Sequence, residues 1–173
     1  TVGTNPNGVA THPDGTRVYV SNGGSASVSV IDTYTQQVVA TIPVGTLPHG
    51  IAVTPDGSRV LVAHGSAGYL AVIDTTSNTR LPDIASSQSG VGLAINPTGT
   101  RAYMAINNGS AVQVFDLIAN AAIATTTLSN RSFGVAVSAD GARAYVVQNQ
   151  AGRVAIVNTA NNSYSNFFSV PGQ

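Results

Sequence analysis

Short stretches of alternating apolar and polar residues recur along the whole chain, separated by Gly, Pro, Asp, Asn and Ser. A period of two predicts β-strands, and the spacing typical of an amphipathic helix does not occur in the sequence. The stretch Arg17-Val18-Tyr19-Val20 is rich in the β-branched and aromatic residues that suit a packed, pleated surface. The pattern therefore predicts an all-β chain of short strands.

The strands belong to a unit that recurs at a constant step of 42 residues. Two residue types mark this step most clearly: Gly8, Gly50, Gly92 and Gly134, and Arg17, Arg59, Arg101 and Arg143. A constant period of this length is the sign of an array built from one supersecondary unit.

Each unit contains four expected strands. The first is brief and apolar, which predicts a strand buried on both faces (residues 9–11, 51–53, 93–95 and 135–137). A turn of the Pro-Asp-Gly kind leads to the second strand, which begins at the repeated Arg. The third strand ends at Asp32 or its equivalents Asp74, Asp116 and Asn158. The fourth, near residues 38–42 in the first unit, is the least regular, as an outer edge strand is.

Sheets of four antiparallel strands at this period are typical of β-propeller blades. We expect a single domain over residues 1–173, with four blades at about 4–45, 46–87, 88–129 and 130–173. A β-solenoid or two stacked sandwiches are the alternatives. Solenoid coils are usually shorter and sandwiches do not repeat so regularly, so the propeller is favoured.

The repeated motif Pro-x-Gly-(Val/Ile)-Ala-x-x-x-Pro-Asp-Gly-x-Arg-x-Tyr-Val, followed by Val-x-Val-Ile-Asp-Thr, resembles the YVTN-type β-propeller repeat family. Tyr19-Val20-Ser21-Asn22 stands nearest to the signature that names the family, and the third and fourth units depart from it. The resemblance covers essentially the whole chain and implies a propeller fold. The resemblance says little about function, because the family resembles surface-layer, lactonase-like and lyase-like propellers alike. Fold alone does not determine function.

Successive loops of an up-and-down blade alternate between two faces of the disc. The Pro-Asp-Gly turns and the loops after the third strands share one face, the bottom. The top face carries the loops after the second strands and the approach segments that lead into each blade: residues 4–7, 46–49, 87–91 and 129–133. At one end of each hairpin we expect an Arg beside an Asp, each pair contributing about 0–1 kcal/mol: Arg17 with Asp32, Arg59 with Asp74, and Arg101 with Asp116.

Charge is scarce in this chain. Seven Arg balance seven Asp, Lys and Glu are absent, and charged residues make up 8% of the total. Without runs of basic residues the sequence offers no positively charged surface of the kind that binds nucleic acid. No apolar run is long enough for a membrane span. The abundance of Ser, Thr, Asn and Gly suits an exported or cell-surface protein of a bacterium or archaeon. Because the chain begins at Thr1, we expect further sequence upstream of it.

Catalysis is the minority reading of the sequence. Six of the seven aspartates occupy repeated positions with structural roles, and the top face offers only His49 and His64 as titratable imidazoles. His12 lies in a turn, and His64 is expected to form hydrogen bonds in a loop. The chain has no Cys, no nucleophile elbow and no phosphate or dinucleotide loop. We therefore expect no catalytic residue, metal ligand or cofactor.

The residue immediately before each innermost strand is the best candidate for ligand contact. This repeated position holds a different residue in every unit: Asn7, His49, Val91 and Phe133. Variation at a repeated position is what adaptation of a scaffold to a ligand produces. His49 is the leading candidate, and we expect Asn7, Arg131 and Phe133 to complete a binding site at the central mouth.

The sequence thus favours a non-catalytic binding or scaffold propeller that engages a protein or a neutral polar ligand through its top face. Two alternatives remain open: a lactonase-like or lyase-like enzyme that uses His49, and a purely structural surface-layer array. The sequence also leaves undecided how the ring of blades closes. Pairing of two chains into an eight-bladed homodimer is favoured over self-closure of four blades and over a piece of a longer propeller.

Overall fold

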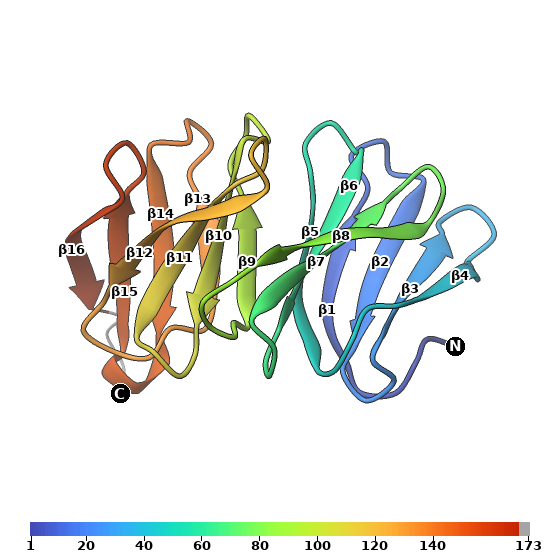
Figure 1. Ribbon diagram of the computed structural model, residues 1–173, viewed down its shortest axis with the longest axis horizontal. Coiled ribbons are helices and arrows are strands. Elements are labelled where there is room, and N and C mark those ends of the chain that lie inside the picture. Colours follow the sequence, from blue (N-terminus) through green and yellow to red (C-terminus); the bar gives the residue numbers. More distant parts are fainter. Residues whose placement is uncertain (170–173) are drawn as a thin grey trace.

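The computed structural model describes residues 1–169, and the expected end of the fourth blade, 170–173, lies outside the described residues. Sixteen strands form four sheets (Figure 1). The first sheet contains β1 (Pro6–Thr11), β2 (Arg17–Asn22), β3 (Ser27–Asp32) and β4 (Gln37–Pro43). The second contains β5 (Pro48–Val53), β6 (Arg59–His64), β7 (Tyr69–Asp74) and β8 (Thr79–Ala85).

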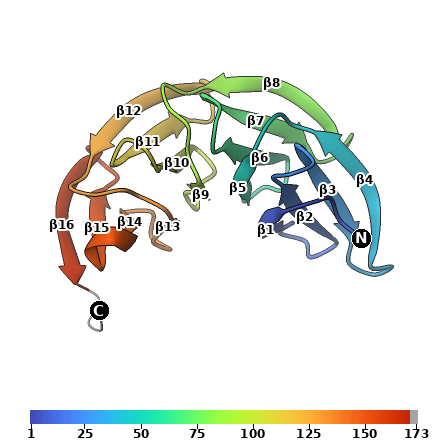
Figure 2. The same ribbon diagram turned by 90° about the horizontal axis from the view of Figure 1, so that it is seen from below.

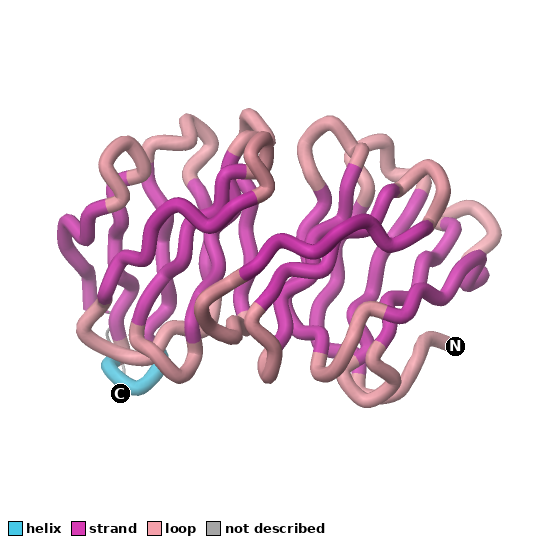
Figure 3. Tube along the Cα trace, in the orientation of Figure 1, coloured by secondary structure: helices cyan, strands magenta, loops and turns pink. Residues whose placement is uncertain are grey.

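The other two sheets repeat this arrangement. The third contains β9 (Gly92–Ile95), β10 (Arg101–Ile106), β11 (Ala111–Asp116) and β12 (Ala121–Thr127). The fourth contains β13 (Val135–Val137), β14 (Arg143–Gln148), β15 (Arg153–Asn158) and β16 (Ser163–Ser169). A single 3-10 turn, η1 (Asn149–Ala151), follows β14 (Figure 3). Within residues 1–169, no helix is long and apolar enough to cross a membrane.

The strands of every sheet lie in sequence order and are antiparallel. The predicted fold class, propeller blades of four antiparallel strands, is therefore confirmed. Figure 2 shows the blades side by side in an open half-ring, with β1, β5, β9 and β13 on the inside and β4, β8, β12 and β16 on the outside. The fourth strand of each unit is the outer edge, as predicted.

The expectation that the first strands are buried on both faces is wrong. In β1 the side chain of Val9 is 68% exposed, and the residues of β9 are only half-buried. The inner strands line the open side of the half-ring (Figure 2), so they have a neighbour strand on one edge and solvent in front of them. Their apolar character reflects packing between blades rather than complete burial.

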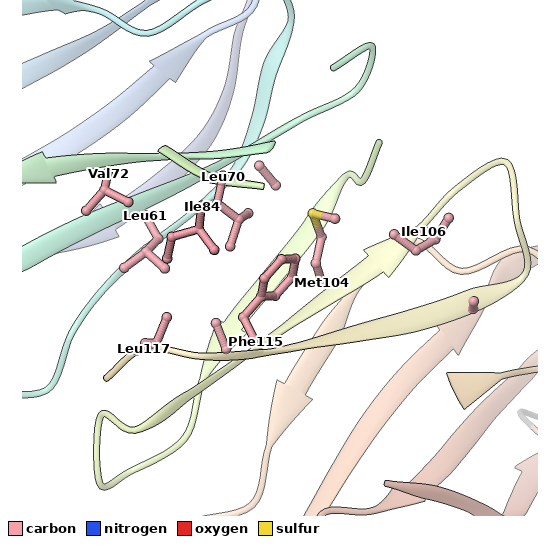
Figure 4. Packing of buried hydrophobic residues seen from close by; sticks show 11 residues of the cluster. Leu61, Leu70, Val72, Ile84, Met104, Ile106, Phe115 and Leu117 are labelled. Atoms are coloured by element: carbon pink, nitrogen blue, oxygen red, sulfur yellow. The ribbon is translucent and has the colours of Figure 1, made fainter. Parts of the chain in front are cut away.

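The core lies in three layers, one between each pair of adjacent blades. The layer between the second and third blades brings Leu61, Leu70 and Ile84 of one sheet against Met104 and Phe115 of the next (Figure 4). Similar clusters fill the layers between the first and second blades and between the third and fourth. Each sheet therefore gains its stability from its neighbours, as repeat architectures do.

The turns of the bottom face are tied together within each blade, which confirms the assignment of the two faces. Thr33 Oγ1 donates a hydrogen bond to the carbonyl of Gly15 over 2.8 Å, and Thr159 makes the same bond to Gly141. In these turns the Asp side chains accept hydrogen bonds from neighbouring groups. The hydroxyl of Thr54 and the amide and hydroxyl of Ser58 lower the pKa of Asp56 to about 2.

The Arg and Asp residues predicted to lie side by side are cross-strand partners: Arg17 with Asp32, Arg59 with Asp74, and Arg101 with Asp116. They do not form ion pairs in the part of the chain that the structure describes, however. The guanidinium groups reach instead to backbone carbonyls of the following blade, at Thr75, Leu117 and Thr159. The prediction was correct in register and wrong about the partner.

Candidate functional site

A cleft of about 460 Å³ opens on the top face among the first three blades. Its lining comes from only three positions of the repeat. These are the predicted ligand position, the residue two places before it, and the residue after the second strand. The predicted ligand position supplies Asn7, His49 and Val91, and the position two residues before it supplies Asn5 and Leu47. The residue after the second strand supplies Gly23, Gly65 and Asn107. The repeat thus carries equivalent residues of successive blades to one place.

Asn7 and His49 lie inside the inner strands rather than just before them. The pairing of β1 with β2 shifts register between Pro6 and Gly8, and that of β5 with β6 shifts between Pro48 and Ile51. Such bulges redirect side chains and are common beside functional sites. Here the irregular backbone coincides with the two polar side chains that line the cleft.

The amide of Asn7 is held in place by the neighbouring blade. Its Nδ2 donates a hydrogen bond to the carbonyl of Pro48 over 3.0 Å. A Cβ atom at Gly23 would lie 2.4 Å from this Nδ2, so only glycine leaves room for the amide. Gly23 and Asn7 are therefore a matched pair, and the amide enters the cleft in a defined position.

His49 is fixed through its backbone. Its carbonyl accepts a hydrogen bond from Ser21 Oγ over 2.6 Å, which ties the second blade to the first. The half-buried ring lies beside Gly65, where an added Cβ would be 3.8 Å from the imidazole Cδ2. The backbone is thus anchored while the imidazole faces the cleft.

Leu47 has an unusual backbone conformation at the rim of the cleft. Its φ is 49°, in the left-handed region that branched and bulky residues rarely adopt. The equivalent Asn5 has φ of 50°, which an Asn tolerates much better. The Leu47 carbonyl accepts a hydrogen bond from the amide of Gly65 over 2.9 Å. Strain of this kind is found at ligand sites more often than elsewhere.

Arg131 was predicted to contact a ligand, but it does not line the cleft. Its Nε donates to the carbonyl of Asn107 over 3.0 Å, and its Nη2 donates to Asn107 Oδ1 over 2.9 Å. A third hydrogen bond reaches Asn108 Oδ1. Arg131 therefore joins the fourth blade to the third and positions Asn107, which does line the cleft.

Phe133, the remaining predicted site residue, does not line the cleft. Its ring is 37% exposed, and its amide donates to the carbonyl of Val147 over 3.0 Å. The fourth blade is thus outside the lining, which comes from the other three. Of the four predicted residues, Asn7 and His49 are brought together in the cleft, and Arg131 donates hydrogen bonds to Asn107, which also lines it.

Amide and imidazole side chains provide the polar part of the cleft. Its polar lining consists of three Asn amides and one imidazole, and its lining contains no Asp and no Arg. Among residues 1–169, no group of three or more His, Asp or Glu side chains is placed to hold a metal ion. The arrangement offers hydrogen-bond donors and acceptors beside the apolar side chains of Leu47 and Val91.

The other two histidines have structural positions. His12 Nε2 lies 2.9 Å from the carbonyl of Gly57, and its Nδ1 lies 2.6 Å from Asp14, so it joins the bottom-face turns of two blades. The expectation that His64 bonds within a loop is wrong. It ends β6 and is fully buried, with its ring centroid 4.5 Å from that of Tyr69. Neither ring nitrogen has a hydrogen-bond partner among residues 1–169.

Comparison with known proteins agrees with the fold. The family model described as YNCE-like beta-propeller matches residues 2–101, well over half of the chain. A solved structure of Kuenenia stuttgartiensis hydrazine synthase is similar over 96% of this chain, with a TM-score of 0.90 and 25% identity. This chain spans about half of that one, 49% of its length. Among curated proteins no sequence relative matches. By the match over residues 2–101, the chain belongs to the YNCE-like β-propeller family.

Proposed function

We propose that this propeller is a non-catalytic binding module whose top-face cleft engages a neutral polar ligand or an uncharged loop of a partner protein. One observation carries the proposal. Asn7, His49 and Val91 occupy equivalent positions of three blades and line one cleft. The residue at this position differs from blade to blade. Different residues at an equivalent position beside a shared cleft are what adaptation of a scaffold to a ligand produces.

The chemistry of the lining supports a ligand without charge. Amide and imidazole groups pair well with hydroxyl and peptide groups, because each can provide hydrogen-bond donors and acceptors. Leu47 and Val91 add apolar surface of the kind that binding pockets combine with a few placed polar groups. An anion would find no Arg in the lining, and a cation would find no carboxylate.

Catalysis by His49 in a lactonase-like or lyase-like manner is supported less well. A general base usually works with a second titratable group or a metal ion that orients it or stabilises charge. The cleft lining supplies neither beside His49. The lack of a second titratable group in the cleft lining favours binding over catalysis.

We propose further that the protein is exported or displayed at a cell surface. The proposal is supported by the low share of charged residues, 8%, and by the abundance of uncharged polar ones. Detection of the protein by antibody in culture medium and envelope fractions would test it. Recovery in the cytoplasmic fraction alone would reject it.

The binding proposal is tested with a matched pair of histidine variants. His49→Ala removes the imidazole from the cleft, and His12→Ala removes one from the bottom face. Calorimetric titration against a panel of neutral oligosaccharides and uncharged peptides should find a binder for the wild type and for His12→Ala. Affinity should fall at least about tenfold in His49→Ala, with a thermal midpoint close to that of the wild type. Equal affinity in His49→Ala would reject the site, and a large loss of its stability would identify His49 as a packing residue.

A further inference from the structure

A second pocket, of about 250 Å³, opens on the bottom face between the first and second blades. The first blade supplies His12, Asp14, Thr16 and Arg17, and the second blade supplies Thr75 and Thr76. Every one of these side chains carries a hydrogen-bonding group. Unlike the top-face cleft, the bottom-face pocket therefore contains a carboxylate and a guanidinium in its lining.

The guanidinium of Arg17 has donors that the protein does not use. A guanidinium carries five N–H donors, and among residues 1–169 the Arg17 side chain donates to one acceptor, the backbone carbonyl of Thr75. The equivalent Arg59 of the second blade donates to two acceptors, the carbonyl of Leu117 and Oδ1 of Asn120. Arg17 therefore keeps donors for a further partner at a position where Arg59 is bonded to the protein twice.

Asp14 has an unused acceptor in the same pocket. Its Oδ1 accepts hydrogen bonds from the backbone amide and the hydroxyl of Thr16, both over 2.8 Å, and lies 2.6 Å from Nδ1 of His12. The bonds from Thr16 are the main reason why the pKa of Asp14 is lowered to about 2. Its Oδ2 accepts no hydrogen bond among residues 1–169, whereas Oδ2 of the equivalent Asp56 accepts one from the hydroxyl of Ser58 over 2.8 Å.

A buried hydroxyl beside Arg17 is also without a partner. Tyr19 is fully buried, and its hydroxyl forms no hydrogen bond within the part of the chain that the structure describes. Burial raises the pKa of this hydroxyl, and the neighbouring Arg17 side chain acts in the opposite direction. Buried polar atoms without a partner are uncommon in folded proteins. Tyr19 thus adds a second unused donor next to the guanidinium.

The difference between the first two blades begins at His12. The equivalent Thr54 keeps its hydroxyl in its own turn, where it donates to Oδ1 of Asp56 and accepts from the backbone amide of Arg59. The larger ring of His12 reaches instead to the next blade, with Nε2 2.9 Å from the carbonyl of Gly57. His12 therefore bridges the two turns and forms part of the pocket lining.

We propose that this bottom-face pocket binds a small free α-amino acid as its zwitterion. The Arg17 guanidinium donates to the α-carboxylate, because its planar fork matches the two carboxylate oxygens, and Oδ2 of Asp14 accepts from the α-ammonium. A free amino acid carries both charges close together, whereas either end of a peptide carries only one of them. The remaining lining, which includes the hydroxyls of Thr16 and Thr76, favours an uncharged side chain. The pocket shares no residue with the top-face cleft, so the inference is independent of the function proposed for that cleft.

The first experiment titrates the ¹⁵N-labelled protein with glycine and with L-serine at constant ionic strength. The backbone amides of Thr16, Thr75 and Thr76 should shift and saturate, with a Kd on the order of 1 mM. Acetate and methylammonium each carry only one of the two charges and should bind at least about tenfold more weakly. An absence of saturable shifts, or acetate binding as tightly as glycine, would overturn the proposal.

The second experiment repeats the glycine titration with two matched pairs of variants. Arg17→Gln and Asp14→Asn should each weaken binding at least about tenfold. Arg59→Gln and Asp56→Asn make the same changes at the equivalent positions of the second blade and should keep the wild-type affinity. Asp14→Asn retains an oxygen that can accept the bonds from Thr16, so it tests the site even if Arg17→Gln does not fold. Unchanged affinity in Asp14→Asn, or an equal loss in the second-blade variants, would show that glycine does not bind between Arg17 and Asp14.

Discussion

The guanidinium Nη1 of Arg101 donates a hydrogen bond to the backbone carbonyl of Thr159, 2.7 Å away in the next blade. Arg59 makes the equivalent bond one blade earlier, and Arg17 makes it two blades earlier. In the sequence each Arg stands opposite an Asp of its own hairpin. In the structure its guanidinium instead donates to a backbone carbonyl of the next blade. A backbone carbonyl at a fixed place accepts a charged donor without the desolvation of a second charge.

Removal of this bond should destabilise the interface that contains it. Arg101→Ala should lower the free energy of unfolding by about 1–2 kcal/mol, because a hydrogen bond from a charged donor is worth about that much when partly exposed. Urea unfolding of the variant and of the wild type measures the difference. Arg143→Ala is the control, because Arg143 is exposed, and it should change stability by less than about 0.5 kcal/mol. Equal losses in the two variants would contradict an interface role.

His64 should make stability depend on pH below neutrality. Burial lowers the pKa of His64 from its ordinary value of 6.5. As pH falls through 6.5, the imidazole of the unfolded chain takes up a proton that the folded chain resists, so the free energy of unfolding should fall. The limiting slope for one group is about 1.4 kcal/mol per pH unit.

Variants at His64 and at His49 separate this effect from that of other groups. His64→Gln places at this position the residue that Gln148 supplies in the fourth blade, and it should remove the slope between about pH 6.5 and pH 5. His49→Ala should retain it. Because the ordinary pKa of Asp is about 3.9, carboxylates contribute to the slope only at more acid pH. A slope that persists in His64→Gln would place the titration elsewhere.

Gly23 and Gly65 occupy equivalent positions but should tolerate alanine differently. An added Cβ at Gly23 lies 2.4 Å from Asn7 Nδ2, so Gly23→Ala should displace the amide and break its bond to Pro48, at a cost of about 0.5–1.5 kcal/mol. At Gly65 the nearest atoms are 3.8 Å away. Gly65→Ala should therefore change stability by less than about 0.5 kcal/mol.

Chemical unfolding and the NMR signal of the Asn7 side-chain amide check the pair. The signal should move in Gly23→Ala and stay in Gly65→Ala. Unchanged Asn7 resonances in Gly23→Ala would show that the amide is not held as the structure places it.

The blades could be predicted from the sequence because local chemistry repeats with them. The step from Gly8 to Gly50, the turn residues and the alternation within each strand are all readable without coordinates. Burial of the inner strands was not readable, because it depends on how far the blades curve around the centre. The sequence alone does not tell whether Val9 is covered by a neighbouring blade or exposed to solvent, as it is in the structure.

The candidate site was half predictable. Variation at the position of Asn7 and His49 pointed to the top face, but the bulges that place them within β1 and β5 leave no simple signature in the sequence. Gly23 and Gly65 did repeat at the right step, and they were a usable signal for space beside those side chains. The role of Arg131 behind Asn107 arises from contact between blades, which spacing alone does not reveal.

The most direct test of a binding cleft on the top face is chemical-shift mapping of the uniformly ¹⁵N-labelled protein, with the tightest neutral oligosaccharide or uncharged peptide from the panel. We expect the shifted amides to concentrate at Asn7, His49, Val91 and Asn107, with the turn around His12 unchanged. Shifts concentrated in the bottom-face turns or on the outer strands, with the cleft residues unmoved, would contradict it.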